Sequence, residues 1–272
     1  MTVMAKATSE IFGRLDLARR VWCVGAIHGE VERLVTLHDR LAARVAPGDR
    51  LVYLGNMIGR GPCSVDVLDE LLAFRRHFLS FRGAEPWDLV YLRGAQEEMW
   101  MKLAQLQFAP NPREVLSWML SQGVGATLRS YGIEPESGFG HCRDGVLAIT
   151  RWTARIQQAV HDHPGHDEIF YGLRRYALTG RDGLLLVSAG LDTGRPLSEQ
   201  RDTFWWDTGS NFRAGDEPYG EFRLVVRGFD RTGGGPAFGR HRATLDGGCG
   251  FGGRLLAACF TPEGELADRV EA

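Results

Sequence analysis

The sequence predicts an α/β protein in which parallel strands alternate with helices. Three short apolar runs support this prediction, because each one ends at a glycine and a polar loop follows it. The runs and their glycines are 20–24 with Gly25, 50–54 with Gly55, and 89–92 with Gly94. Sites in such sheets lie beyond the carboxyl ends of the strands, so we expect these three loops to converge.

Helical patterns lie between and after these strands. Residues 30–45 place apolar side chains on one helical face: Leu34, Leu37, Leu41 and Val45. A Pro-Gly-Asp turn at 47–49 then separates this helix from the second strand. Two further helices are expected at 64–74 and 97–107.

The C-terminal half is richer in strands than the N-terminal half. Apolar runs beside glycines predict strands at 183–187, 223–227 and 255–260. The Gly-Gly-Gly-Pro sequence at 233–236 predicts a loop. Residues 134–145, which are rich in glycine, serine and charge, are the nearest thing to a flexible interruption. No repeat or linker divides the chain, so a single domain is expected over 1–272.

The composition suits a globular chain with a sizeable core, since 44% of its 272 residues are hydrophobic and 24% are charged. A net charge of −2 does not indicate binding to nucleic acid or to an anionic membrane. No run approaches the roughly 18 apolar residues of a membrane span, and residues 1–14 lack the apolar segment of a signal peptide. Five cysteines, an odd number without close pairs, indicate reduced thiols. A cytoplasmic protein is therefore expected.

The glycine loops resemble the motifs of a known family. VGAIHG at 24–29 resembles G-D-x-H-G, LGNMIGRGP at 54–62 resembles G-D-x-x-D-R-G-P, and LRGAQEEM at 92–99 resembles L-R-G-N-H-E-E-M. Later, VSAG at 187–190, VRGF at 226–229 and LDGGCGFGG at 245–253 resemble V-H-A-G, V-H-G-H and L-D-T-G-x-x-x-G-G. In order and spacing, over about residues 20–260, the chain resembles the phosphoprotein phosphatases, which are serine/threonine phosphatases of the calcineurin-like metallophosphoesterase type.

The resemblance is strongest to the bacterial branch of that family, which includes small serine/threonine phosphatases and diadenosine tetraphosphatases. It implies a fold of two packed mixed β-sheets flanked by helices. It also implies a site at the strand ends for two divalent metals, such as Mn, Fe or Zn. In such a site the metals clamp the phosphate and activate a bridging water.

Five of the six metal-ligand positions that the resemblance implies have lost their strong ligand. His28 is the histidine that remains. The substituted positions carry Ala26, Asn56, Ala95, Ser188 and Phe229. Losing even a partner of a ligand costs about 10–100-fold in metal affinity. We therefore expect no metal and no other cofactor.

The acid–base residues are also replaced. Gln96 occupies the position of the general-acid histidine, and Gly59 that of the aspartate supporting it, whereas Glu97 is retained. Glutamine cannot deliver a proton to a leaving alkoxide. The chain therefore resembles a pseudophosphatase, for which no catalytic residue is expected. Because the carboxylates and the metals disappear together, the pocket can fold without ions.

Arginines in the same loops indicate recognition of an anion. Arg60 stands where the family uses a phosphate-binding arginine, Arg227 replaces a histidine expected at the rim, and Arg231 follows it closely. A guanidinium fork suits phosphate or carboxylate. These three arginines, together with His28 and Asn56, are the candidate ligand-binding residues.

Three of the site residues also have a structural interpretation. Arg60 could pair with Glu97 or Glu98 and brace the loops. His28 could be a packing or hydrogen-bonding residue rather than a lone metal ligand. Phe229 is expected to fill the volume of the former metal site.

A histidine-rich segment, HDHPGHD at 161–167, offers three imidazoles and two carboxylates that could bind zinc or nickel. It also suits the start of a helix, because Asp167 and Glu168 favour a first helical turn and the family carries a histidine near the position of His166. The helix start is the preferred interpretation. Elsewhere, the aromatic run at 204–206 is expected in the core, and Cys249 is expected to be a structural thiol.

Two functions remain open from the sequence. The first is a regulatory or scaffolding protein without catalysis, which binds a protein partner, including a phosphorylated one, or a small anion. The second is a residual or remodelled metallophosphoesterase, either a protein phosphatase or a diadenosine tetraphosphatase-like hydrolase. Neither nucleic acid nor a membrane is expected as a partner. A site filled by side chains favours the scaffold, and an open basic pocket favours an anionic ligand.

Overall fold

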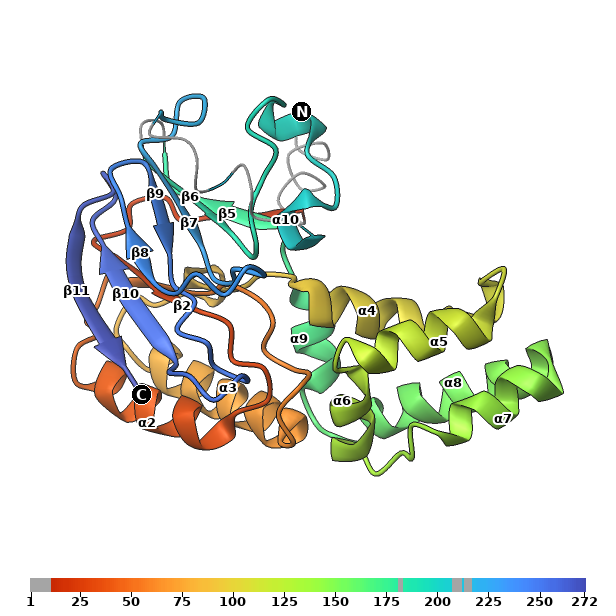
Figure 1. The fold of residues 1–272 in the computed structure, drawn as a ribbon. Helices are drawn as coiled ribbons and strands as arrows, with labels where there is room; N and C mark the ends of the chain where they lie inside the picture. Colours follow the sequence, from red (N-terminus) through yellow and green to blue (C-terminus); the bar gives the residue numbers. More distant parts are fainter. Residues whose placement is uncertain (1–10, 181–182, 207–211, 213–216) are drawn as a thin grey trace, which may run out of the picture.

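Two mixed β-sheets pack face to face, and helices lie against them (Figure 1). The computed structural model describes residues 11–180, 183–206, 212 and 217–272. The predicted fold class, an α/β fold of two packed mixed sheets flanked by helices, is confirmed.

The five-stranded sheet contains the three strands predicted in the N-terminal half. Its order is β11 (Leu266–Glu271), β10 (Leu256–Phe260), β2 (Val21–Val24), β3 (Arg50–Tyr53) and β4 (Leu89–Tyr91). Strands β2, β3 and β4 are parallel, and β10 and β11 extend the sheet in antiparallel fashion. The carboxyl ends of β2, β3 and β4 therefore lie at one edge.

The six-stranded sheet contains two of the three strands predicted in the C-terminal half, at 183–187 and 223–227, whereas the third, at 255–260, is β10 of the five-stranded sheet. The order of the six-stranded sheet is β1 (Phe12–Arg14), β5 (Tyr176–Leu178), β6 (Leu184–Val187), β7 (Leu224–Arg227), β9 (Arg242–Thr244) and β8 (Ala237–Phe238). Strands β6, β7 and β9 are parallel. Four short strands of this sheet, β1, β5, β8 and β9, were not predicted, because two or three residues are too few to show a period. The predicted loop at 233–236 is confirmed.

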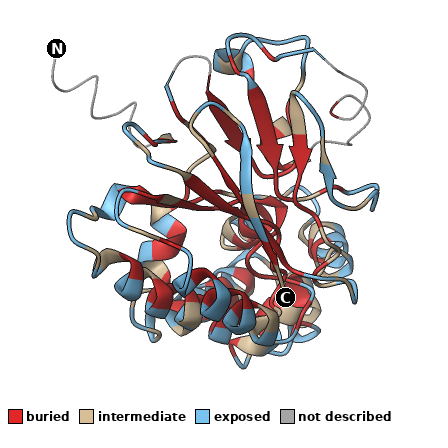
Figure 2. Cartoon of the chain, turned by 90° about the vertical axis from the view of Figure 1, so that its left-hand side faces the viewer, coloured by how far each residue is buried: buried red, intermediate tan, exposed pale blue. Residues whose placement is uncertain are grey.

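Alternation along the strands divides the core into two layers. In β2, Val21 and Cys23 face the other sheet, whereas Trp22 and Val24 pack with the helices. The helices on that side are α2 (Val31–Ala42) and α3 (Ser64–Leu79), which correspond to the predicted helices at 30–45 and 64–74. Figure 2 shows the central strands of both sheets as buried.

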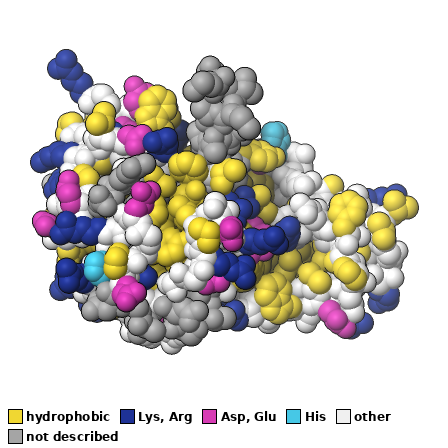
Figure 3. Space-filling model, turned by 90° about the horizontal axis from the view of Figure 1, so that it is seen from above, with side chains coloured by type: hydrophobic (Ala, Val, Ile, Leu, Met, Phe, Trp, Pro, Cys, Tyr) yellow, Lys and Arg dark blue, Asp and Glu magenta, His cyan; other side chains and the backbone are white. Residues whose placement is uncertain are grey.

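A helical lobe extends beyond the sheets, at the right of Figure 1. It consists of α4 (Ala95–Leu103), η2 (Leu106–Phe108), α5 (Pro112–Ser121), α6 (Val124–Ser130), α7 (Ser137–Asp144), α8 (Val146–His161) and α9 (His166–Gly172). The helix predicted at 97–107 is α4, which begins earlier and ends sooner. Large hydrophobic side chains on the lobe are exposed, including Phe108 and Leu147, and hydrophobic side chains are visible on the lobe in Figure 3.

The prediction of a flexible interruption at 134–145 is wrong, because most of this segment forms α7. One of its glycines, Gly138, lies in a closely packed position. A Cβ added at Gly138 would lie 2.7 Å from atoms of both Leu116 and Trp152. The absent side chain thus lets α7 approach α5 and α8.

The remaining elements are η1 (Pro86–Asp88), η3 (Leu197–Glu199) and α10 (Thr203–Trp206). In α10, Phe204 and Trp205 are buried as predicted, whereas Trp206 is half-buried. All five cysteines are free. No helix among the described residues has both the length and the apolar character needed to cross a membrane.

Candidate functional site

The loops after β2, β3, β4 and β7 meet at the carboxyl edge of the strands, as the sequence predicts. The backbone N–H groups of Ile27 and His28 both donate to the carbonyl of Asn56, at 3.0 and 2.8 Å. The N–H of Ala26 donates to the carbonyl of Gly228 at 3.1 Å. These contacts bring together positions that are far apart in the sequence.

The backbone is strained at this point. His28, Asn56 and Arg60 have φ values of 54°, 53° and 58°, and Leu17 is the only other non-glycine residue with positive φ in the described part of the chain. Non-glycine residues in this conformation are uncommon and gather at functional sites. The strained conformation thus remains although most of the implied metal ligands do not.

Glu97 organises the loops from within the protein. Its buried carboxylate accepts hydrogen bonds from the backbone N–H groups of Asn56 (2.8 Å), Met57 (2.7 Å), Ile58 (3.3 Å) and Gly94 (2.9 Å). Burial raises the pKa of Glu97, and these hydrogen bonds oppose that shift. Both carboxylate oxygens therefore accept hydrogen bonds from the loops and are not available to bind a ligand.

Arg60 is not the brace that the structural interpretation suggested. Glu97 binds backbone N–H groups, and Glu98 pairs with Arg93 at 3.2 Å. No carboxylate within the described ranges lies at ion-pair distance from Arg60. Its guanidinium carbon instead lies 4.4 Å from the ring centre of Phe251.

The positions implied as metal ligands have no free carboxylate. Ala26 is buried and has no donor atom. The Oδ1 of Asn56 accepts a hydrogen bond from the N–H of Gln96 at 3.0 Å. The Nδ2 of Asn56 and the Oγ of Ser188 are buried, and neither has a hydrogen-bond partner among the described residues. An amide nitrogen does not ligate a divalent cation, and a neutral hydroxyl is a weak ligand.

Aromatic rings surround the one retained histidine. The ring centres of Phe229 and Phe251 lie 5.2 and 5.5 Å from that of His28, and both meet it edge-on. Phe229 therefore helps to fill the site, as predicted. Phe251 was not predicted, although an aromatic residue inside the glycine-dense stretch 245–253 was a visible signal.

His28 is held as a neutral imidazole. Burial, and to a lesser degree the positive charge of Arg60, lower its pKa from 6.5 to about 3. The backbone of Ile58 opposes this shift, but neither ring nitrogen makes a hydrogen bond of normal geometry within the described structure. His28 is a packed, uncharged residue in a largely apolar setting.

Gln96 occupies the space beside Gly59. A Cβ added at Gly59 would lie 2.1 Å from the Oε1 of Gln96. The Nε2 of Gln96 donates to the carbonyl of Gln122 at 2.8 Å, which anchors the side chain in that position. The two replacements of the implied acid–base pair therefore fit each other sterically.

The space that remains is a small cleft of about 40 Å³. It is lined by His28, Asn56, Arg60, Ala95, Gln96, Met99, Gln122, Trp205, Trp206, Phe229 and Arg231. A cavity that holds one water has a volume of about 10–15 Å³, and a pocket that holds a small molecule usually has a volume of roughly 300–1,000 Å³. The interior of the site is thus largely filled by side chains.

Two arginines lie at the mouth of this cleft. Arg60 and Arg231 are both exposed, and burial together with the charge of Arg231 lowers the pKa of Arg60. Within the part of the chain that the structure describes, no carboxylate lies at ion-pair distance from Arg231 either. Among the described residues, the cleft mouth therefore carries two like charges without a compensating acid.

The predicted position of Arg227 at the rim is wrong. Its side chain is buried, and its Nη2 lies 2.9 Å from the Oδ2 of Asp230. Its Nε donates to the Oγ1 of Thr244 at 2.9 Å, and its Nη1 donates to the carbonyl of Ala189 at 3.3 Å. Arg227 lies inside β7, where it braces that strand against β9, and it cannot reach a ligand at the cleft.

The prediction that Cys249 is structural is confirmed. Its Sγ donates to the carbonyl of Ile27 at 3.2 Å, and burial raises its pKa to about 12. A thiol with such a pKa is not a nucleophile at neutral pH.

The side chains at the strand ends do not fit the two-metal centre that the resemblance implies. They offer one imidazole, one hydroxyl and an amide whose oxygen is already bonded. One group of potential metal ligands does occur in the described structure, but it lies away from these loops, at Asp69, His163 and His166.

No protein-family model and no curated protein matches the sequence. Among solved structures, the chain is similar to a candidate diadenosine tetraphosphatase, with 19% identity and a TM-score of 0.56, over 96% of this chain and 98% of that one. It is also similar to a protein serine/threonine phosphatase from Saccharomyces cerevisiae with similarity to human phosphatase PP5, with 14% identity and a TM-score of 0.52, over 96% and 82% of the two chains.

A third similar structure is a cold-active protein tyrosine phosphatase, with 11% identity and a TM-score of 0.51, over 96% of this chain and 82% of that chain. At these identities the likeness concerns the fold. It agrees with the two mixed sheets flanked by helices. The chain has the fold of the phosphoprotein phosphatases and related calcineurin-like metallophosphoesterases.

Proposed function

We propose that this chain is a phosphatase-like protein without catalysis, which recognises a phosphoryl or similar anionic group on a protein partner through Arg60 and Arg231. One observation carries the proposal. Phe229 and Gln96 occupy the site at the strand ends, and the ring of Phe251 packs on His28. The mouth of the cleft holds two guanidinium groups that have no acidic partner among the described residues.

The case against catalysis rests on the chemistry of the side chains. The phosphoesterase reaction of this fold depends on metals that activate water and neutralise the phosphate. The site lacks the carboxylates that hold such metals. Gln96, which stands at the proton-donor position, is bonded to the carbonyl of Gln122 and has no proton to give a leaving group.

The case for a surface-bound anion rests on shape and charge. A cleft of about 40 Å³ cannot enclose a nucleotide or a metabolite. A phosphorylated side chain presented by a partner needs only the rim. There, two guanidinium groups favour a dianion, and binding relieves the repulsion between them.

The test for catalysis is metal analysis of the purified protein together with hydrolysis of p-nitrophenyl phosphate in added manganese, magnesium or zinc. We expect no turnover and no pair of tightly bound metals. Two divalent metals bound per chain, or turnover that is lost in His28→Asn, would overturn the proposal in favour of a remodelled phosphoesterase. The unpaired, neutral imidazole of His28 is the observation that keeps this second function under test.

The test for recognition is titration with a degenerate phosphoserine peptide library and with its unphosphorylated counterpart. We expect binding of the phosphorylated library that weakens at least tenfold in Arg60→Gln and in Arg231→Gln and that falls as salt is raised. The matched control is Arg82→Gln, which removes an exposed arginine away from the cleft. Equal binding of both libraries, or an equal loss in the control, would exclude the proposed mode.

A further inference from the structure

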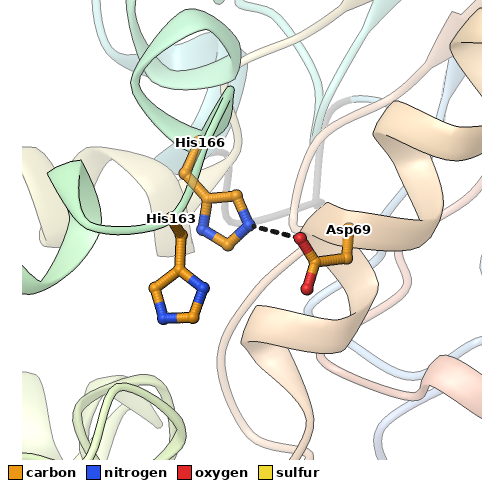
Figure 4. A group of neighbouring side chains, drawn as sticks. All are labelled: Asp69, His163 and His166. Carbon is orange, nitrogen blue, oxygen red and sulfur yellow. Dashed lines mark hydrogen bonds and ion pairs between the residues drawn. The ribbon is translucent and has the colours of Figure 1, made fainter.

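A compact cluster of two histidines and one aspartate lies apart from the strand-end loops. Figure 4 shows Asp69 on α3 facing His166, the first residue of α9, with His163 from the preceding turn beside it. One ligand atom from each of the three side chains lies within 4.8 Å of the other two. We propose that Asp69, His163 and His166 form a zinc site that ties α3 to the end of the helical lobe.

The donor set selects the class of metal. Two imidazole nitrogens and one carboxylate oxygen suit zinc, whereas calcium and magnesium prefer oxygen ligands alone. Three protein ligands leave the fourth tetrahedral position for water. The side chain of Asp69 is 57% exposed, which gives the ion a path from solvent.

The geometry is already close to that of a metal site. The Nε2 of His166 and the Oδ1 of Asp69 are 3.1 Å apart. Ligand atoms around a tetrahedral zinc ion at the usual bond lengths are about 3.3 Å apart. His163 lies almost parallel to His166, with ring centres 5.0 Å apart and an angle of 13°. Closing on zinc requires a small movement of the His163 side chain, which makes no hydrogen bond within the described structure.

A buried tyrosine fixes the orientation of His166. The hydroxyl of Tyr131 lies 2.7 Å from the Nδ1 of His166, and the Tyr131 ring stacks on Trp100. Without metal, the hydroxyl donates to Nδ1, and Nε2–H donates to Asp69. With zinc on Nε2, the imidazole proton is on Nδ1, and the Tyr131 oxygen accepts a hydrogen bond from Nδ1–H. Such partners orient metal-binding histidines and strengthen them as ligands.

The other members of the histidine-rich segment do not join the cluster. His161 pairs instead with Asp167, with 2.8 Å between its Nδ1 and the carboxylate, and both lie on the surface. The sequence could not identify this set, because Asp69 is 94 positions before His163. Only the tertiary structure shows which of the histidines lie beside Asp69.

The experiment is calorimetric titration of zinc chloride into tag-free, EDTA-treated full-length protein. We expect one zinc per chain and an upward shift of the melting temperature by several degrees, because zinc binds the folded state. His163→Ala and Asp69→Asn should each weaken binding by more than about 100-fold, and Tyr131→Phe by about 10–100-fold, as expected for the loss of a ligand's partner.

The control is His161→Ala, which removes a histidine from the same segment but not from the cluster, and it should bind zinc like the unaltered protein. Circular dichroism checks that each variant is folded. Absence of zinc uptake at micromolar concentration, or loss in His161→Ala but not in His163→Ala, would overturn the proposal. The search for metals at the strand ends is best made in His163→Ala, where this site cannot contribute.

Discussion

His28 is the one strong ligand retained among the metal-ligand positions that the resemblance implies, and its surroundings disfavour a charge. Two phenylalanine rings meet its ring edge-on, and Arg60 lies near it. A neutral imidazole in this setting fills space in the packed site and does not act as a metal ligand. Its positive φ favours asparagine as a replacement, since asparagine tolerates that conformation.

The low pKa of His28 makes stability depend on pH. Unfolded chains protonate this histidine below pH 6.5, whereas the folded chain resists protonation down to about pH 3. The unfolded state therefore binds more protons in between, and stability falls as the pH is lowered. We expect His28 to account for a loss of about 2 kcal/mol between pH 7 and pH 5, measured by urea unfolding at each pH.

His28→Asn is the matched variant, because it removes the titrating group and keeps the backbone conformation. Its free energy of unfolding should be lower at pH 7 but should change less between pH 7 and pH 5. An unchanged pH dependence in His28→Asn would show that the histidine is not held neutral.

The loop after β3 and the start of α4 act as one unit. Glu97 of α4 binds three N–H groups of that loop, and Gln96 occupies the space over Gly59. The positive φ of Gly59, +85°, adds a second constraint, since side chains are strained there. The replacements at 59 and 96 are thus coupled through contact between two elements.

A double-mutant cycle tests this coupling. Gly59→Ala should destabilise the protein by about 2–4 kcal/mol, from backbone strain and from displacement of Gln96. Gln96→Ala should cost less alone, and the double variant should be more stable than the sum of the two losses predicts. Denaturant unfolding of the four proteins gives the interaction energy. Strict additivity would mean that Gln96 does not fill this space in solution.

At the scale of the whole molecule, the chain forms the phosphatase fold although most of the metal ligands that the resemblance implies are replaced. The two-sheet core, the parallel strands and the hydrogen bonds among the loops hold the site in place through apolar packing and Glu97. The fold should therefore tolerate metal-ligating side chains better when they are introduced together than when one is introduced alone. A lone carboxylate at Ala26 would be buried without a counter-ion.

We expect a combined variant to bind two manganese ions per chain, whereas Ala26→Asp alone should destabilise the protein and bind none. The combined changes are Ala26→Asp, Asn56→Asp, Ala95→Asn, Ser188→His and Phe229→His. Since Gln96 stays in place, metal binding should return without efficient hydrolysis of an aryl phosphate. Calorimetry and the hydrolysis assay measure the two properties.

The control for this variant adds His28→Asn, which removes the retained ligand and should weaken metal binding by more than about 100-fold. A folded combined variant that takes up no manganese would contradict the match between these positions and a metal centre.

The sequence by itself predicted the fold, and its resemblance to the phosphatases implied the positions at which metal ligands are missing. Strands that meet glycines and helices with a regular apolar face are local patterns, and the order of six loop motifs is a linear property. For the same reason it predicted β2, β3, β4 and β10 of the five-stranded sheet and β6 and β7 of the six-stranded sheet. It did not predict β11, nor the short strands β1, β5, β8 and β9, whose residues show no period of their own.

Only the tertiary structure decided what each polar side chain contacts, because those contacts join residues far apart in the sequence. Arg227 looked like a rim residue until its pairing with Asp230 and Thr244 placed it inside the sheet. Phe251 reached His28 from a distant loop. Asp69 joined His163 and His166 in the same way. Local patterns specify the elements, whereas packing between elements specifies which side chains can meet a ligand.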